Sequence, residues 1–482
     1  MSRIMTNVSS LVAARILDSN NKMLNTSLER LSTGYRINRG KDDPAGLIAS
    51  ETLRGEIAAI KAAMDNTERA DMVISVAEGG LQEISNLLVE LESLVDTTAN
   101  EAALGSAEVE ANQLQIDSIL DTINRIATST EFQGKKLLNG TLDYTTSGVT
   151  IGPSGGSAIA ALQINSARIP PGGYRTVTVQ VTTSAQTARV YASGSAVAAG
   201  GVTLQVSGKY GVEQFSFGSG TSFSEVANAI NQSKALTGVS ASFSATGGGT
   251  LMFNSTDYGS EAFVTVQTIQ GTTLAVSGGD STYGDHGVDV GLTINGAQAV
   301  TKGLDASLHT TVLDLDLTLD AGFAQQTVLS KTFYINGGGA DFSIAPTLGL
   351  NATASLGIQN VATGNLGKGG LGYLSSLGRG QDNDMASGNF AVAQRIIRQA
   401  NEQISSLRGR LGAFSKNTLT SAYNALAVAL ENTSAAESAI RDTDFARETS
   451  ELTRAQILVN AATSTLQLAN AQPRNVLALL GG

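Results

Sequence analysis

The chain has 482 residues, of which 41% are apolar, so it can bury a substantial core and wholesale disorder is excluded. Its net charge is −11, and Lys and Arg form no cluster that would attract a nucleic acid or an anionic membrane surface. No apolar run approaches the ~18 residues needed to span a bilayer. We therefore expect no nucleic-acid partner and no membrane insertion.

Cysteine is absent, which excludes disulfides, cysteine metal sites and thiol nucleophiles. Two interpretations stay open: cysteine is simply scarce, or the chain must remain unlinked while it is unfolded and moved. The first residues, Met1 to Asn7, lack the apolar stretch of a signal peptide, which by itself favours a cytosolic protein.

The N-terminal segment reads as two helices separated by a turn. Gly34 stands where a helix C-cap glycine is expected, and Asp43-Pro44 supplies an N-cap carboxylate followed by a proline suited to the first helical turn. The second helix is predicted to run to about Asn100. Apolar residues on one face of the first helix are Ile4, Val8, Leu11, Leu24, Leu28 and Leu31.

Long stretches of both ends lack proline, as long helices require, and carry apolar stripes with alternating spacings of three and four residues. Such stripes are coiled-coil seams. On the N-terminal side they are Leu81, Ile84, Leu88, Leu91 and Val95, then Val109, Gln113, Ile116, Leu120, Ile123 and Ala127. On the C-terminal side they are Ile397, Ala400, Ile404, Leu407, Leu411 and Phe414, then Leu452, Ala455, Val459, Ala462, Leu466 and Ala469.

The middle of the chain has a different pattern. Residues 141–375 hold only 21 of the 73 charged side chains, and the segments 176–182 and 313–320 alternate apolar and polar residues as half-buried strands do. Gly247-Gly248-Gly249 is predicted to turn a hairpin, and Ser222 with Glu225 to form a capping box on one intervening helix.

A narrow amphipathic helix is marginal alone in water, so each terminal segment needs a partner. The simplest solution pairs the two ends with each other. The predicted class is α+β: a discontinuous helical coiled-coil core with a mainly antiparallel β insertion. The predicted parts are an inner helix (1–42), helical core with a β-hairpin (43–175), a β-rich insertion of one or two subdomains (176–340), returning helical core (341–445) and an inner helix (446–482).

Two thin helices would still leave apolar surface exposed at the extreme ends, which other copies of the chain could cover. A head-to-tail contact that does not close on itself generates an open helical filament. The sequence therefore predicts a self-assembling structural protein with paired helical ends.

Both ends also carry long motifs. The N-terminal segments 31–38 (LSTGYRIN) and 41–46 (KDDPAG) closely resemble the signature of bacterial flagellins. The C-terminal segments 406–413, 439–446, 452–458 and 475–480 resemble that family's C-terminal blocks in the same order. The resemblance covers roughly 1–165 and 340–482. A weaker similarity joins 223–231 and 237–241 to a motif of some flagellins and hook-associated proteins.

The resemblance implies a homopolymer: terminal helices form the inner tube of a hollow filament, the helical core its outer tube, and the middle its surface. It implies a secreted subunit of the extracellular flagellum that leaves unfolded through the type III flagellar export apparatus. The implied partners are an export chaperone, the filament cap and hook-junction proteins. The inner-core seam would comprise Ile4, Val8, Leu11, Leu28, Leu31, Leu452, Val459, Leu466, Leu477 and Leu480. The outer-core seam would comprise Leu81, Ile84, Leu88, Leu91, Val95, Ile397, Ile404, Leu407, Leu411 and Phe414.

Glu90 departs from the family pattern. It stands where many enterobacterial flagellins present a basic residue to the mammalian toll-like receptor for flagellin. Reversing a charge in an interface typically costs a few kcal/mol, so weak recognition by that receptor is expected.

Other chemical interpretations have little support. The GxGxxG pattern at 367–372 neither follows a buried parallel strand nor opens a helix, which favours a flexible return over a dinucleotide site. Asp280, Asp285, His286 and Asp289 could ligate a cation, but their spacing favours a solvated turn. His309 has no cysteine and no visible Ser-His-Asp arrangement around it, so a surface or strand histidine is expected. No cofactor and no catalytic activity are expected.

Two other classes stay open: a hook–filament junction protein, which shares the terminal helices, and a filament subunit with an enzymatic insert in 176–340.

Overall fold

The computed structural model describes residues 6–100, 105–148, 158–170, 172–245, 249–280, 283–327, 329–347, 349 and 352–480, with backbone alone for 473–480. The chain forms two compact units. Unit 1 comprises 1–67, 344–347 and 421–482, and unit 2 comprises 68–343 and 348–420.

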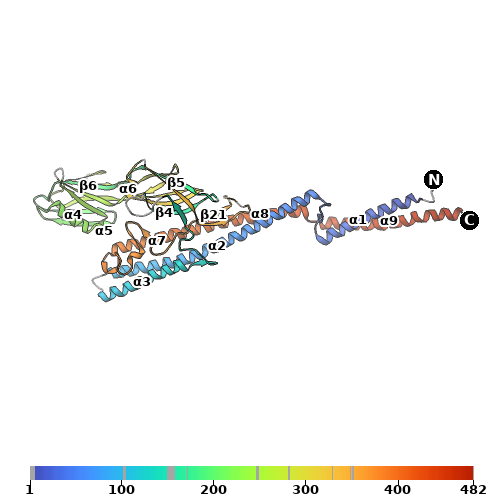
Figure 1. Ribbon diagram of the computed structural model, residues 1–482, viewed down its shortest axis with the longest axis horizontal. Helices are drawn as coiled ribbons and strands as arrows, with labels where there is room; N and C mark the ends of the chain where they lie inside the picture. The colour runs from blue at the N-terminus through green and yellow to red at the C-terminus, as the bar shows by residue number, and fades with distance from the viewer. Residues whose placement is uncertain are drawn as a thin grey trace. The chain divides into compact units, whose positions relative to one another are not determined.

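Unit 1 is built from helices of both chain ends, and Figure 1 shows α1 and α9 side by side. The predicted C-cap is confirmed, since Gly34 has φ +77° and its N–H donates to the Arg30 carbonyl. Asp43 caps the next helix by accepting from the Gly46 N–H at 2.9 Å. The helices are α1 (Val8–Thr33), the start of α2 (Pro44–Thr98), α8 (Thr420–Arg441) and α9 (Phe445–Leu480).

The helical part of unit 2 contains the rest of α2, α3 (Ser106–Ser129) and α7 (Phe390–Ala413). Gln394 donates to Asp96 at 2.9 Å and Arg398 to Glu92 at 2.8 Å, so α2 and α7 run antiparallel. Short elements complete this part: β1 (Glu131–Phe132), β2 (Lys135–Lys136), β22 (Gly367–Lys368), β23 (Gly372–Tyr373), 3₁₀ helices Leu374–Leu377 and Met385–Ser387, and a π-helix Phe414–Leu419.

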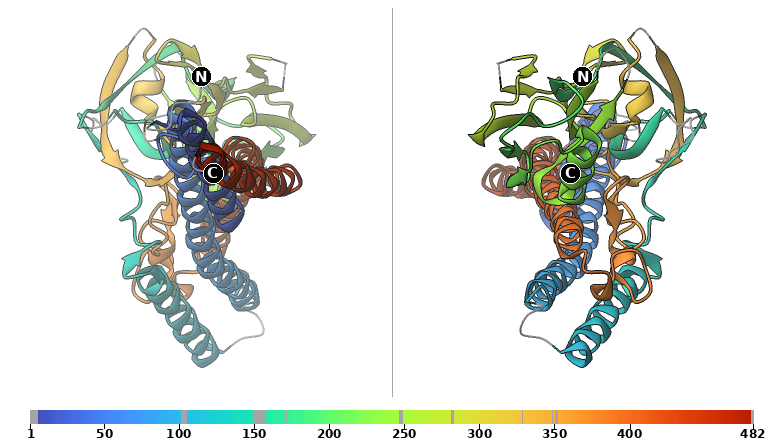
Figure 2. Two further views of the ribbon diagram at one scale, coloured as in Figure 1. Left: turned by 90° about the vertical axis from the view of Figure 1, so that its right-hand side faces the viewer. Right: turned by 90° about the vertical axis from the view of Figure 1, so that its left-hand side faces the viewer.

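Unit 2 also holds two β sandwiches, and Figures 1 and 2 show their strands on one side of α7 with α3 on the other. The first sandwich stacks sheets β15-β14-β5-β19-β3 and β16-β17-β18-β4. Its strands are β3 (Tyr144–Ser147), β4 (Ile159–Ala167), β5 (Arg175–Thr183), β14 (Gly291–Ile294), β15 (Ala297–Gln298), β16 (Val300–Lys302), β17 (Asp305–His309), β18 (Leu313–Leu319) and β19 (Ser330–Gly338). Helix α6 (Ala321–Ala324) follows β18, and β20 (Ala340–Ser343) pairs with β21 (Thr353–Leu356).

The second sandwich stacks sheets β12-β6-β10-β9 and β13-β11-β7-β8. The predicted capping box is confirmed at the start of α4, where Ser222 and Glu225 exchange hydrogen bonds. Its elements are β6 (Thr187–Ser193), β7 (Val202–Gly208), β8 (Gly211–Phe217), α4 (Phe223–Gln232), α5 (Lys234–Thr237), β9 (Val239–Ser244), β10 (Thr250–Tyr258), β11 (Phe263–Gly271), β12 (Val276–Gly278) and β13 (Gly284–His286).

Alternation of apolar and polar residues supplies both sandwich cores. In β5 the side chains of Val177, Val179 and Val181 are buried, and β18 buries its leucines in the same way, as the period of two predicts. Each sandwich has its own separate core of aliphatic and aromatic side chains. The middle of the chain therefore contains two subdomains.

The second sandwich is inserted into the first between β5 and β14, and the chain leaves and returns at one point, where Gln186 and Val288 form an antiparallel bridge. The sequence predicts that the β-rich insertion begins at residue 176. In the structure β3 and β4, which precede that residue, already contribute side chains to the core of the first sandwich. Four-residue β3 is too short, and burial along β4 too irregular, to be recognised from periodicity. The predicted β9–β10 hairpin is present, but residues 247 and 248 lie outside the described residues.

Candidate assembly surface

Helices α1 and α9 of unit 1 pair in antiparallel fashion. The Asn7 amide donates to the Ala469 carbonyl at 2.8 Å, and the Asn20 amide donates to the Leu458 carbonyl at 3.1 Å. Towards the other end of the pair Arg30 lies 3.6 Å from Glu448. The two ends of the chain are thus joined along the length of α1.

Small residues form the seam between these helices. Ala13, Asn20 and Ser27 are buried on α1, and Ala455, Ala462 and Ala469 on α9. Members of each set are seven residues apart, which is the coiled-coil repeat. Small side chains let the backbones approach, but they bury little apolar area, so this pairing is weak for its length.

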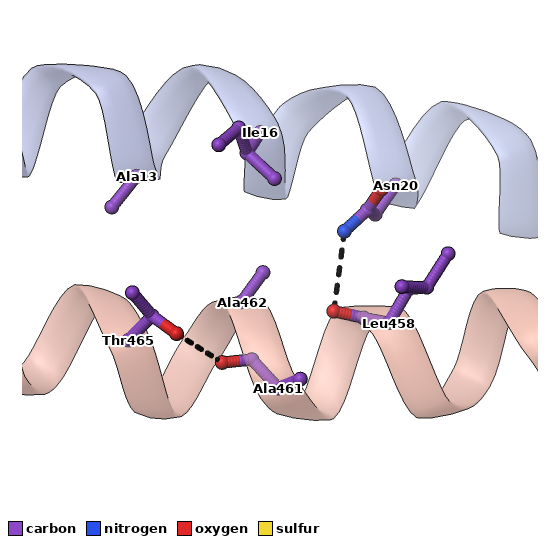
Figure 3. Close-up of a pocket in the computed structure, with 7 residues that line it drawn as sticks. All are labelled: Ala13, Ile16, Asn20, Leu458, Ala461, Ala462 and Thr465. Atoms are coloured by element: carbon purple, nitrogen blue, oxygen red, sulfur yellow. Dashed lines mark hydrogen bonds between the residues drawn. The ribbon is translucent and has the colours of Figure 1, made fainter.

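A shallow groove of about 200 Å³ follows the seam. Figure 3 shows Ala13 and Ile16 of α1 above Ala461, Ala462 and Thr465 of α9, with the Asn20–Leu458 hydrogen bond at one end. The lining is mostly apolar and holds no ionisable side chain. The groove can accept an aliphatic side chain but offers no chemistry for a reaction.

Several large apolar side chains on the two helices remain exposed. Leu11 is 64% exposed on α1, and Ile457 and Leu468 are 62% and 71% exposed on α9. Ile457 and Leu468 are eleven residues apart, close to three helical turns, so they share a face that points away from the seam. The other large exposed apolar residues among the described side chains of the pair are Val8, Val12, Ile16, Met23, Leu28, Phe445 and Leu458.

Residues of the predicted inner-core assembly seam differ in their burial within unit 1. Leu31, Leu452, Val459 and Leu466 are half-buried along it, whereas Val8, Leu11 and Leu28 are exposed. The buried small residues of α1 escape a search for large aliphatic residues, although their seven-residue spacing was a usable signal. Ile4 lies outside the described residues, as do the side chains of Leu477 and Leu480.

The outer-core stripes of unit 2 pack as one core. Arg408 of α7 also donates to Gln82 of α2, in register with the two antiparallel contacts already described. The half-buried member is Phe414, whose ring centroid lies 6.0 Å from that of Phe342. The fully buried residues are Leu81, Ile84, Leu88, Leu91, Val95, Ile397, Ile404, Leu407 and Leu411.

Within unit 1 the terminal motifs meet. The Arg36 N–H donates to the Arg441 carbonyl at 2.7 Å, and the Thr443 N–H donates to the Gly34 carbonyl at 2.9 Å. The Arg441 guanidinium lies 4.5 Å from the centroid of the Tyr35 ring, a cation–π contact. The turn after α1 and the turn before α9 thus form a small two-stranded joint.

Other candidate residues form no reactive site. Residues 367–372 form the β22–β23 turn, where Gly367 has φ +130° and a Cβ would lie 2.4 Å from the Gly372 carbonyl oxygen. Asp280 contacts His286 at 3.0 Å, Asp285 accepts from the Arg189 N–H, and Asp289 accepts from Ser260 and Gly303. His309 is exposed and lies 2.9 Å from Asp314. Across the described ranges no three His, Asp or Glu side chains are placed to hold a metal ion.

In the part of the chain that the structure describes, no helix combines the length and apolar character of a membrane span.

The chain matches three protein-family models. These are the bacterial flagellin N-terminal helical region over residues 4–143, the C-terminal helical region over 395–480 and the flagellin hook IN motif over 203–257. The last match covers residues 223–231 and 237–241, whose sequence resembles a motif of some flagellins and hook-associated proteins.

Similar proteins match along almost the whole length. Flagellin A of Vibrio anguillarum is 30% identical over 476 residues, 98% of each chain. Flagellin C of Vibrio cholerae is 28% identical over 486 residues, 99% of this chain and 98% of that protein. A solved structure of flagellar hook-associated protein-3 from Legionella pneumophila covers 80% of this chain and 97% of that one, with 12% identity and a TM-score of 0.30, which is too low to support an argument. On the family models and the full-length relatives, this chain belongs to the bacterial flagellins, the structural, non-enzymatic subunits of the flagellar filament.

Proposed function

We propose that the exposed apolar faces of α1 and α9 are the surfaces through which copies of this flagellin polymerise. The observation that carries the proposal is the set of large aliphatic side chains, Leu11, Ile457 and Leu468 foremost, that face away from the seam. Monomeric soluble proteins rarely leave apolar residues gathered on one element, and such surfaces mark interaction sites. A second copy of the chain is the partner that the family's polymerisation implies.

The contact is head-to-tail. The exposed apolar side chains of α1 on one copy pack against those of α9 on the next. Contacts of that kind generate an open helix when the rotation between copies does not close. The product is a hollow helical filament that serves swimming.

Each part of the chain then has a place in the filament. Segments 1–42 and 446–482 form its inner tube, the helices within 43–175 and 341–445 its outer tube, and the two β sandwiches its surface. The outer-tube role rests on the continuous aliphatic core between α2, α3 and α7, which makes a rigid rod suited to close packing.

Replacing Leu468 by Glu tests the assembly surface. The side chain is 71% exposed, so Leu468→Glu is expected to leave the α1–α9 pair folded while filament elongation is lost, because each new contact would bury an unpaired carboxylate. Circular dichroism checks the helices, and electron microscopy with sedimentation measures polymer.

Gln467→Glu is the matched control, since the neighbouring side chain is exposed and acquires the same charge. It should polymerise far better than Leu468→Glu. Normal filaments from Leu468→Glu would count against this surface, and long filaments from the parent distinguish a filament subunit from a hook-junction protein.

We also infer the route and the accessory partners. A chain that leaves the cell unfolded must stay free of disulfides, which is compatible with the absence of cysteine. The type III flagellar export apparatus, an export chaperone, the filament cap and the hook-junction proteins would act on this chain in turn. The destination is the extracellular filament.

Glu90 limits recognition by the mammalian toll-like receptor for flagellin. Its side chain is exposed on α2 of unit 2, where a partner could reach it. Glu90→Arg is expected to raise the response of a receptor-reporter cell line several-fold, since a like-charge contact would be removed. Glu83→Arg, an exposed substitution two turns away, is the control. If the parent and Glu90→Arg gave equal receptor responses, Glu90 would not be the cause of weak recognition.

A further inference from the structure

The second sandwich touches helix α7 through Tyr210. The Tyr210 ring centroid lies 4.5 Å from the Arg395 guanidinium carbon, and its hydroxyl donates to Asp257 at 2.5 Å. The ring also packs on Gly238, where a Cβ would lie 2.7 Å from a ring carbon. Burial, with Asp257 beside it, raises the pKa of Tyr210 to about 12, so the hydroxyl stays a donor. This contact needs both the aromatic face and the hydroxyl.

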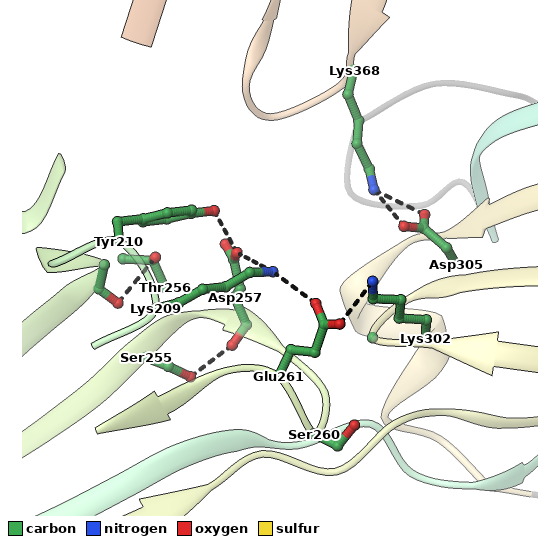
Figure 4. Close-up of polar contacts among 12 residues, drawn as sticks. Lys209, Tyr210, Ser255, Thr256, Asp257, Ser260, Glu261, Lys302, Asp305 and Lys368 are labelled. Carbon is green, nitrogen blue, oxygen red and sulfur yellow. Dashed lines mark hydrogen bonds and ion pairs between the residues drawn. The ribbon is translucent and has the colours of Figure 1, made fainter. Parts of the chain in front are cut away.

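Ion pairs extend from Tyr210 across to the first sandwich, as Figure 4 shows. Lys209 Nζ lies 3.4 Å from Asp257 and 3.7 Å from Glu261. Glu261 in turn accepts from Lys302 Nζ at 2.7 Å. Charges of alternating sign therefore run from the second sandwich to the first.

The same line of contacts returns to α7. Lys302 and Asp305 are cross-strand partners in β16 and β17, and Asp305 lies 2.7 Å from Lys368 Nζ. Next to Lys368, the Gly367 backbone exchanges two hydrogen bonds, of 2.9 and 2.8 Å, with the Gln403 amide. Gln403 and Arg395 both lie on α7, about two turns apart. The polar contacts thus close a circuit that begins and ends on this helix.

We propose that this circuit is a latch that holds the second sandwich along α7 and that opens when salt screens its charges. The ion pairs are partly exposed, with the Lys209 side chain 35% and the Lys302 side chain 69% accessible. Screening lengths fall from about 30 Å at 0.01 M salt to about 3 Å at 1 M, so pairs of this kind weaken strongly over that range. The latch goes beyond polymerisation and does not depend on it, because every contact lies within one unit of one chain.

The weakest link is the contact with α7. Between the sandwiches, Asp289 accepts hydrogen bonds from Ser260 and Gly303 at 2.9 and 2.7 Å, and the Gln186–Val288 bridge joins the same point. Among the described residues, the contact to α7 is made by the short helix α5 and by Tyr210 against Arg395. Opening should therefore separate the second sandwich from α7 while both sandwiches stay folded.

Paired spin labels measure the latch directly, because the parent chain has no cysteine that would compete for label. Ser118→Cys on α3 and Gln270→Cys on β11 are both exposed and lie outside the circuit. In the full-length monomer at about 0.01 M salt, where charges are little screened, the distance between the labels should form one narrow peak. At about 1 M salt the narrow peak should be replaced by a broad distribution of distances between the labels.

Arg395→Glu removes the cation that lies over the Tyr210 ring, puts a negative charge in its place, and should abolish the narrow peak even at low salt. Tyr191→Ala is the matched control, since Tyr191 is exposed to nearly the same extent as Tyr210, 38% against 39%, but stands outside the circuit. It should keep the narrow peak. A parent distribution that is broad at low salt, or that is unchanged by 1 M salt, would overturn the latch. The salt series needs no circuit variant, so the test survives if Arg395→Glu misfolds.

Discussion

A chain that lacks residues 446–482 is expected to remain monomeric under every condition that polymerises the full chain. The deletion removes Ala455, Ala462 and Ala469, which cover the small-residue face of α1 in unit 1. Helix α1 would then keep little of its partner surface, and isolated helices are marginal in water because most of their stability comes from packing. Both assembly faces would be lost together, one by deletion and one by unfolding.

Electron microscopy and sedimentation would show filaments absent, and circular dichroism would show more helix lost than the deleted segment contains. A matched control deletes the second sandwich, residues 187–286, and joins the flanking strands through a short glycine linker. Gln186 and Val288 already lie in one antiparallel bridge, so the ends to be joined are adjacent. The control should polymerise; filaments from the 446–482 deletion would refute the role of the helix pair.

The second large effect is expected at Arg410, a residue of α7 in unit 2. Its guanidinium lies against the Gln163 amide, with Asp143, Asp314 and Asp316 close enough to favour its charged form. Burial lowers the pKa of Arg410, and its Nε atom is buried without a hydrogen-bond partner. Removing Arg410 takes away the positive charge that these partly buried carboxylates face, so the change is expected to destabilise this contact more than the loss of an exposed ion pair would. Arg410→Ala should therefore loosen the first sandwich from α7.

The stability lost on Arg410→Ala should depend on pH. Burial raises the pKa of Asp143, and Arg410 acts in the opposite direction, so Arg410→Ala raises that pKa further. A group with a raised pKa in the folded state stabilises below its unfolded pKa, near 4, and loses that contribution as pH rises through the folded value. The variant should approach the stability of the parent near pH 4 and fall furthest behind it at pH 7.

Hydrogen exchange of the β4 and β18 amides measures the local free energy of opening at both pH values. Arg398→Ala is the control on the same helix: its side chain is 63% exposed and pairs with Glu92, so the change should cost at most about 1 kcal/mol. Arg410→Met keeps most of the volume and separates packing from charge. Equal losses for Arg398→Ala and Arg410→Ala, or a difference that ignores pH, would contradict the assignment.

Sequence periodicity predicted the helical core of unit 2 well because the determining residues are large. Leu81 to Val95 and Ile397 to Leu411 are aliphatic stripes whose spacing specifies both the helix and its buried face. On α1 the face buried within one copy is Ala13, Asn20 and Ser27, which a search for large aliphatic residues does not select. Packing between such residues is decided by the partner helix, which local periodicity does not contain.

The pairing of the strands could not be predicted from the sequence, for a different reason. Strand β3 pairs with β19, and Thr145 bonds to Gly337 across a separation of 192 residues. Such pairings depend on loop closure and on the second sandwich folding inside the first, neither of which leaves a local signal. Likewise, the polar circuit around Tyr210 joins residues from strands, turns and a helix that lie far apart in the sequence. Surface charges without a period cannot be assigned partners from one sequence.

The antiparallel pairing of α1 with α9 also limits how early in synthesis the helix pair can form. Asn20 meets the Leu458 carbonyl across 438 residues, so α1 has no partner until nearly the whole chain exists. At a synthesis rate of roughly 5–20 residues per second, that wait is on the order of half a minute or more. During that time the α1–α9 face cannot form, and an incomplete chain has nothing to add to a growing end. Both ends of the polypeptide must therefore be present before the helix pair can form.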